Sequence, residues 1–253
     1  MYLNSEGIIF RQTKTASGRR MILLFTAKYG KLSVGTSMTE KGKSRSSLAL
    51  RPFTYGNYQI FQGRNYYNLD RAETIRSYYG IGEDIDKYMA AAYILELTEK
   101  VVPEEAAQPG VFHLLIGFLE ELEQRKKQHL TLVLAYEIRL LRLLGTFPEL
   151  GECAVCGTKQ NLTHFSVTRG GMICEKCAEK ILSSGDETLI YRTKFDIVNV
   201  INYFASNPLK SFRNIALNEE DAAALRSILR SYISYHLDVG DLKSESILTG
   251  GLN

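Results

Sequence analysis

The sequence predicts an α+β protein, in which a small N-terminal β-barrel precedes a helical domain that is interrupted by a four-cysteine module. Three observations lead to this prediction: short apolar runs separated by turn residues before residue 80, helical periodicity after it, and two CxxC pairs beyond residue 150. The length of 253 residues suits one large or two modest domains. We expect domains at residues 1–80 and 81–253, with the cysteine module at about 150–190.

Five apolar runs predict five short strands, at Gly7–Phe10, Met21–Phe25, Leu32–Val34, Tyr58–Phe61 and Tyr66–Leu69. Turn residues separate them, including Gly18 after the first run and Gly63 before the last. Five short strands in about seventy residues favour a small barrel or sandwich, and the oligonucleotide-binding (OB) fold is one candidate.

Helical spacing of apolar residues begins after Gly82. This spacing predicts helices with an apolar face at residues 85–95, 112–122 and 130–141. Further helices are predicted at about 193–206 and 219–237. The last helix has a strong start signal, since Asn218 is a favourable N-cap and Asp221 stands at the capping-box position. The cysteine module is therefore expected to be an insertion within a helical domain.

Charge divides the chain unevenly. Residues 1–80 hold 13 basic and four acidic side chains, a net charge of +9, whereas the remainder holds 18 basic and 24 acidic side chains, a net charge of −6. Such a contrast favours contact between the N-terminal part and a polyanion such as nucleic acid, although a merely solubilising basic surface is the alternative.

A basic loop and a series of aromatic residues support the nucleic-acid interpretation. Glycine and serines surround Lys41, Lys43 and Arg45, so this segment can follow a phosphate backbone. Proteins that bind single strands combine a basic groove with aromatic rings on which bases stack. The segment from Phe53 to Tyr67 contains six aromatic residues, counting both ends.

Most of these aromatic residues are expected to be packing residues. We assign Phe53, Tyr58 and Phe61 to core or cross-strand packing. Tyr66 and Tyr67 are adjacent on a predicted strand, so only one of them can face inward. One exposed tyrosine is expected there, and stacking of a base on it is an open alternative.

The two CxxC pairs predict a structural zinc site. Cys153 and Cys156 are separated from Cys174 and Cys177 by 17 residues, within the zinc-ribbon range. Each CxxC turn can present two thiolates to one tetrahedral ion at about 2.3 Å, and four thiolates leave no position for water or substrate. Replacement of one cysteine by His164, and a redox role for the CxxC pairs, are the alternatives.

No pattern indicates catalysis. Gly42-Lys43-Ser44 resembles the end of a phosphate-binding loop, but Ser37 stands where the first glycine is required. A deaminase would need a His-x-Glu sequence, which is absent. The non-enzymatic interpretation competes with a zinc-dependent nucleic-acid enzyme and with an RNA-binding zinc-ribbon protein.

The sequence also predicts a cytoplasmic location. Its first residues lack a basic stretch followed by a long apolar run, and no apolar run approaches the ~20 residues that span a membrane. We therefore expect no membrane partner, and reduced or metal-bound cysteines.

The whole pattern resembles the RecO family of bacterial recombination mediators. The resemblance rests on EGIIFRQTKTASGRRMILLFTAKYGKLSV near the start, GKSRSSLALRPF, CAVCG with ICEKC, and YISYHLDVGDLKSESIL near the end. It implies an OB-fold barrel, a helical domain with a zinc ribbon, binding of single- and double-stranded DNA, and annealing of complementary strands. It further implies action with RecR and single-stranded DNA-binding protein, to load RecA recombinase onto DNA.

The resemblance assigns one structural Zn²⁺ to Cys153, Cys156, Cys174 and Cys177. It places DNA contact on basic residues between Arg11 and Arg64. The candidates are Arg11, Lys14, Arg19, Arg20, Lys41, Lys43, Arg45, Arg51 and Arg64.

Overall fold

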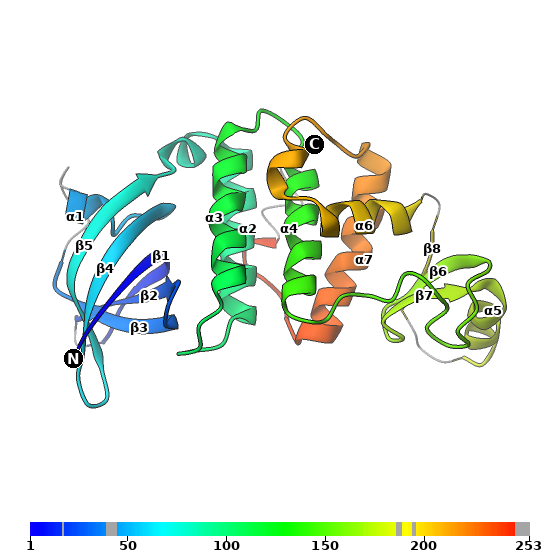
Figure 1. The fold of residues 1–253 in the computed structure, drawn as a ribbon, viewed down its shortest axis with the longest axis horizontal. Helices are drawn as coiled ribbons and strands as arrows, with labels where there is room; N and C mark the ends of the chain where they lie inside the picture. Colours follow the sequence, from blue (N-terminus) through cyan, green and yellow to red (C-terminus); the bar gives the residue numbers. More distant parts are fainter. Residues whose placement is uncertain (17, 39–44, 186–188, 194–195, 246–253) are drawn as a thin grey trace. The chain divides into compact units, whose positions relative to one another are not determined.

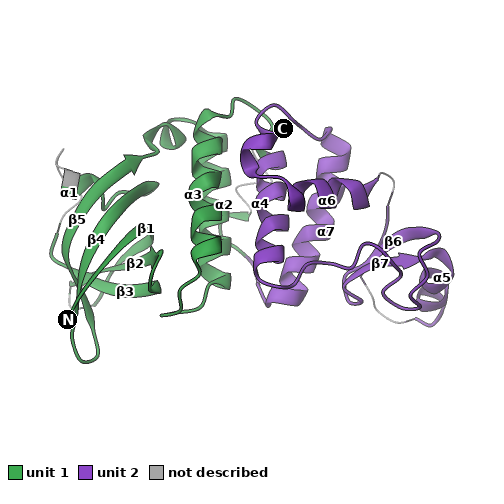
Figure 2. Cartoon of the chain, in the orientation of Figure 1, with its two compact units in different colours: residues 1–129, 242–253 green, residues 130–241 purple. Residues whose placement is uncertain are grey.

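A computed structural model describes residues 1–16, 18–38, 45–185, 189–193 and 196–245 (Figure 1). The chain forms two compact units, residues 1–129 with 242–253, and residues 130–241 (Figure 2). The division into domains at residue 80 stays a prediction, and two helices that follow this residue share the first unit with the N-terminal strands.

The first unit contains a closed five-stranded barrel, which confirms the predicted OB-fold class. Its strands are β1 (Tyr2–Lys14), β2 (Arg20–Thr26), β3 (Gly30–Thr36), β4 (Thr54–Gln62) and β5 (Tyr67–Ser77), in the order β1-β2-β3-β5-β4. All neighbours are antiparallel except β3 and β5, which pair in parallel at only two positions. The strands extend beyond the predicted runs because polar residues on their outer faces interrupt the apolar pattern without ending the strand.

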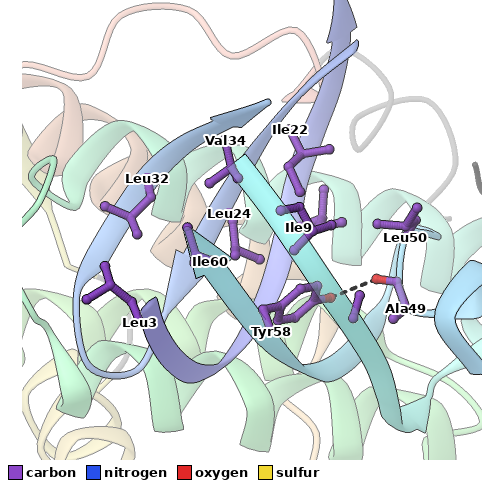
Figure 3. Packing of buried hydrophobic residues seen from close by; sticks show 12 residues of the cluster. Leu3, Ile9, Ile22, Leu24, Leu32, Val34, Ala49, Leu50, Tyr58 and Ile60 are labelled. Carbon is purple, nitrogen blue, oxygen red and sulfur yellow. Dashed lines mark hydrogen bonds between the residues drawn. The ribbon is translucent and has the colours of Figure 1, made fainter. Parts of the chain in front are cut away.

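The barrel interior is filled by aliphatic side chains from all five strands (Figure 3). The short helix α1 (Arg45–Leu48) leads into Ala49 and Leu50, which join this core. The buried Tyr58 hydroxyl donates a 2.7 Å hydrogen bond to the Ala49 carbonyl, and burial raises the pKa of Tyr58. One hydrogen bond therefore ties the segment after α1 to strand β4.

Helices α2 (Ile85–Val101) and α3 (Pro109–Gln124) follow a 3-10 turn at Tyr79–Glu83. The apolar run of β2 does not alternate because both of its faces are covered. Leu24 belongs to the barrel core, whereas the ring of Phe25 meets that of Phe112 on α3 edge to face, with centroids 5.5 Å apart. The chain later returns to α2, where the Glu96 carboxylate accepts hydrogen bonds from the backbone N–H groups of Lys243 and Ser244.

The second unit contains helices and the cysteine module. Its elements are α4 (His129–Leu143), β6 (Leu162–Ser166), β7 (Gly171–Cys174), α5 (Glu175–Ser183), β8 (Ile190–Arg192), α6 (Ile197–Ser206), a 3-10 turn at Leu209–Phe212, and α7 (Glu219–Leu237). Strands β7, β6 and β8 form a sheet in that order. No helix in the described part of the chain is both long and apolar enough to cross a membrane.

The start of α7 confirms the predicted N-cap and refines it. The Asn218 side chain accepts a 2.8 Å hydrogen bond from the Asp221 N–H, which satisfies one of the free donors of the first turn. The Asp221 carboxylate in turn accepts from the Asn218 side-chain amide at 2.7 Å, instead of the backbone N–H that a full capping box would use.

The Tyr58 hydrogen bond makes a stability prediction. Tyr58→Phe leaves the buried Ala49 carbonyl without its donor, so we expect the free energy of unfolding to fall by about 1–3 kcal/mol. Urea denaturation measures this change. The control is Tyr79→Phe, whose parent side chain is 68% exposed. Equal stability of the two variants would contradict this role of the bond.

Candidate nucleic-acid interface and metal centre

A groove of about 520 Å³ runs along the seam where β3 meets β5, and we call it the seam groove. It contains three cations, two tyrosines and two carboxylates. These are Arg19, Lys31, Arg64, Tyr66, Tyr67, Glu104 and Glu105. The parallel pairing is limited to Val34 with Tyr67 and Gly35 with Asn68, so the strands diverge beyond these pairs and leave the groove between them.

Strand alternation explains how the cations reach this groove. Leu32 and Val34 point into the barrel core, so Lys31 and Ser33 point outward. Arg19, in the β1–β2 loop, donates a hydrogen bond to the Asn68 side chain, which fixes the guanidinium over the seam. Arg64 is exposed in the β4–β5 loop. Two loops and one strand thus bring three positive charges together.

The seam groove includes only two of the predicted DNA-contacting residues, Arg19 and Arg64. Two of the remaining candidates have partners elsewhere: Arg11 pairs with Glu99 at 2.8 Å, and Arg20 donates to the Met38 carbonyl at 3.1 Å. Lys14 is exposed at the end of β1, Arg45 is the first residue of α1, and Arg51 is partly buried after this helix. Lys41 and Lys43 lie outside the described residues.

Carboxylates from α2 and α3 engage part of the positive charge of the barrel. Arg11 meets Glu99 on α2, and Arg76 lies 3.3 Å from Glu120 and 3.0 Å from Glu123 on α3. These pairs are partly exposed, so each contributes little to stability. Their consequence is electrostatic, because they reduce the positive potential on the helix-covered side of the barrel.

The aromatic residues divide much as the sequence predicts. Phe53 and Tyr58 are buried, and Tyr67 packs against the barrel core. Burial and the nearby Glu105 carboxylate raise the pKa of Tyr67. Tyr66 has half of its surface exposed, and Phe61 is only partly buried. One exposed tyrosine therefore stands at the groove, as expected for this pair.

The four cysteines gather in one cluster of the second unit. Their sulfur atoms all lie within 4.8 Å of one another. Four sulfurs at about 2.3 Å from a tetrahedral ion are about 3.8 Å apart. The Cys156 and Cys174 sulfurs are 3.8 Å apart, so the donor set fits such an ion. Cys153, Cys174 and Cys177 are buried, whereas Cys156 is exposed.

The pKa values of Cys153 and Cys177 are shifted in opposite directions. Burial alone would raise the pKa of Cys153, but backbone N–H groups of Cys174, Cys156 and Val155 point at its sulfur and lower the pKa to about 6. Burial, together with the neighbouring thiols, raises the pKa of Cys177 to about 12. Ionisation of all four thiols would place four negative charges close together, so it requires a cation bound between the sulfur atoms.

Local sequence builds this cluster. Gly157 adopts a positive φ of 73° directly after the first pair, and its N–H donates to the Cys153 carbonyl at 2.8 Å. A turn at Gly170 joins β6 to β7, and β7 ends at Cys174. The intervening segment therefore returns as a hairpin and brings the second pair back to the first.

His164 does not belong to the sulfur cluster. Its Nδ1 lies 3.0 Å from the Thr163 hydroxyl, which in turn donates a 2.6 Å hydrogen bond to the Glu175 carboxylate. That hydroxyl lowers the pKa of Glu175. Among the described residues, only the four cysteines come together as a set of metal-ligating side chains.

Three contacts attach the ribbon to α7 within the second unit. The rings of Phe165 and Tyr232 lie 5.6 Å apart, and the Tyr191 hydroxyl lies 2.7 Å from that of Ser231. The His236 Nε2 lies 2.7 Å from the Val167 carbonyl oxygen. Two aromatic side chains and one backbone carbonyl of the ribbon therefore contact the last helix.

Sequence reasoning missed two features of the seam groove. Lys31 is not among the predicted DNA-contacting residues, although strand alternation around Leu32 places its side chain outward. Glu104 and Glu105 could not be found from local sequence, because they reach the groove through a backbone hydrogen bond from Glu105 to the Lys31 carbonyl. This contact joins segments that are distant in the chain.

Comparison with known proteins agrees with the resemblance. The family described as "Recombination protein O N terminal" matches residues 1–78, and "Recombination protein O C terminal" matches residues 82–246. "DNA repair protein RecO" of Thermoanaerobacter sp. is 29% identical over 97% of this chain and 96% of its own length. The protein of the same name from Bacillus pumilus is 33% identical over 71% of this chain and 70% of its own length. The chain belongs to the RecO family of DNA repair proteins.

Proposed function

We propose that this protein is a DNA-binding recombination mediator that anneals complementary strands. Together with RecR, it would help to load RecA recombinase onto single-stranded DNA coated by single-stranded DNA-binding protein. The observation that carries the DNA-binding part is the seam groove, where Arg19, Lys31 and Arg64 stand beside an exposed tyrosine. Family membership supports the repair role. The site of action that this role requires is the nucleoid, in the cytoplasm.

The proposed mechanism is charge neutralisation without covalent chemistry. Phosphates that enter the groove would release their counterions as the three cations replace them. Glu104 and Glu105 repel phosphate, so the backbone would follow the side of the groove with Arg19 and Arg64. The basic segment with Lys41, Lys43 and Arg45 remains a predicted second contact for DNA.

We further propose that the four cysteines hold one structural Zn²⁺. Tetrahedral coordination by four sulfurs is typical of structural zinc and leaves no open position at the metal. Bound zinc would cross-link the two CxxC turns and so stabilise the fold of the ribbon.

Replacement of Arg64 tests the groove. Arg64→Ala should weaken DNA binding and reduce the slope of log affinity against log salt by about 0.7 for single strands and about 0.9 for duplex. Fluorescence anisotropy over a salt series measures both quantities. Arg71→Ala, which removes an exposed arginine on β5 outside the seam groove, is the matched control. An unchanged slope in Arg64→Ala would remove this groove from the proposed site.

Metal analysis tests the zinc proposal. The purified protein should contain one zinc ion per chain, and a strong chelator should remove it and unfold the ribbon, with a loss on the order of 10 kcal/mol of binding and folding free energy. Elemental analysis and circular dichroism measure these changes. Cys174→Ser should lose the metal, whereas His164→Ala should keep it. Zinc loss in His164→Ala would instead support a histidine ligand, and DNA turnover that depends on Cys174 would support a zinc-dependent enzyme.

A further inference from the structure

Three aromatic rings form a row on the outer surface of the barrel. Tyr2 pairs with Phe61 across β1 and β4, and their ring centroids are 5.5 Å apart. Phe61 continues to Tyr66, with centroids 6.2 Å apart. Tyr2 is 56% exposed and Tyr66 is 50% exposed. We call Tyr2, Phe61 and Tyr66 the aromatic row.

The aromatic row begins at the seam groove. Tyr66 lines this groove together with Arg64, and Gln62, which follows Phe61 on β4, lines it as well. If a nucleic-acid backbone lies in the groove, its phosphates would contact the cations, and its bases would lie beside the exposed rings. This order of charge and aromatic surface is the one that single-strand-binding sites use.

The ring of Tyr66 lies against its own loop. The Gly63 N–H donates a 2.9 Å hydrogen bond to the Tyr66 carbonyl and closes the turn. A Cβ atom at Gly63 would lie 2.4 Å from the Tyr66 ring, so only glycine allows the ring to pack against the backbone there. A ring that already packs against the backbone loses less conformational entropy when a base stacks on it.

Cross-strand packing accounts for the contact between Tyr2 and Phe61, but it does not account for the row as a whole. If packing were their only role, these rings would be expected to be buried. Instead, Tyr2 and Tyr66 at the two ends of the row each expose about half of their surface to solvent. Tyr66 shares the groove with three cations, and the row continues from Tyr66 through Phe61 to Tyr2. The complementary ligand is therefore one with negative charge and flat apolar faces.

We propose that the aromatic row binds unpaired bases, one on Tyr66 and one on Tyr2, and so distinguishes single-stranded from double-stranded DNA. This inference rests on the proposed function, because it requires the backbone to lie in the seam groove. The rings are spaced more widely than the about 3.4 Å between stacked bases, so the bound bases must be splayed apart. Paired and stacked bases of a duplex present no free faces to the row.

Replacement of the exposed rings provides the main test. Tyr66→Ala and Tyr2→Ala should each lower the affinity of the full chain for a single-stranded oligonucleotide by about 5- to 150-fold, with duplex affinity unchanged. The salt slope should also stay unchanged, because no phosphate contact is lost. Tyr66→Phe should keep the parent affinity. Tyr79→Ala, which removes an exposed tyrosine outside the row, is the matched control.

An oligonucleotide of abasic sites separates stacking from other effects. The parent and Tyr66→Ala should bind this probe equally, since it offers phosphates but no bases. Gly63→Ala should displace the Tyr66 ring and reproduce the Tyr66→Ala preference. Because the chain has no tryptophan, Tyr66→Trp gives a further reading that does not depend on the alanine variants: its fluorescence should be quenched by single strands and not by duplex.

The outcomes separate this inference from the proposed function. If Arg64→Ala weakens binding while the Tyr2 and Tyr66 variants keep the parental ratio of single-strand to duplex affinity, the aromatic row has no such role and the groove remains. Equal losses on both forms of DNA would also overturn the inference, because they would indicate a structural effect. Absence of DNA binding by the parent chain would refute the proposed function itself.

Discussion

The short parallel pairing between β3 and β5 is the constraint on which the DNA-binding surface depends. It closes the barrel through Val34 with Tyr67 and Gly35 with Asn68, and the strands separate beyond these residues. A longer pairing would fill the seam with backbone hydrogen bonds, whereas the absence of pairing would open the barrel. The observed closure keeps an intact apolar core on one side of the strands and a polar groove on the other.

The distribution of charge follows from the same arrangement. The N-terminal part of the chain is strongly basic, but α2 and α3 carry carboxylates that meet Arg11 and Arg76 on the barrel. Among the described residues, Arg19 and Arg64 form no ion pair with α2 or α3, whereas the Lys31 ammonium donates to the Glu99 carbonyl on α2. The groove therefore keeps three positive charges against the two carboxylates of Glu104 and Glu105, a local balance that the net charge of the sequence does not reveal.

Local patterns of the sequence predicted most elements and the cysteine cluster, because strand runs, helix faces and CxxC turns depend on neighbouring residues. They could not predict contacts between distant segments. The sequence did not predict the extension of β5 to Ser77, because the second half of this strand is mostly polar. Ala72, a small side chain, is its main contribution to the barrel core. Tyr2 was overlooked because its partner Phe61 lies on another strand. The seam groove likewise joins two loops, β3 and residues 104–105, which no local pattern connects.

The most direct test of the mediator account is annealing of complementary strands that are coated with single-stranded DNA-binding protein, measured by energy transfer between labelled strands with and without this chain. The account predicts that the chain accelerates duplex formation, and that Arg64→Ala slows this reaction at moderate salt. Annealing at the same rate with and without the chain, at protein concentrations that saturate the DNA, would contradict it.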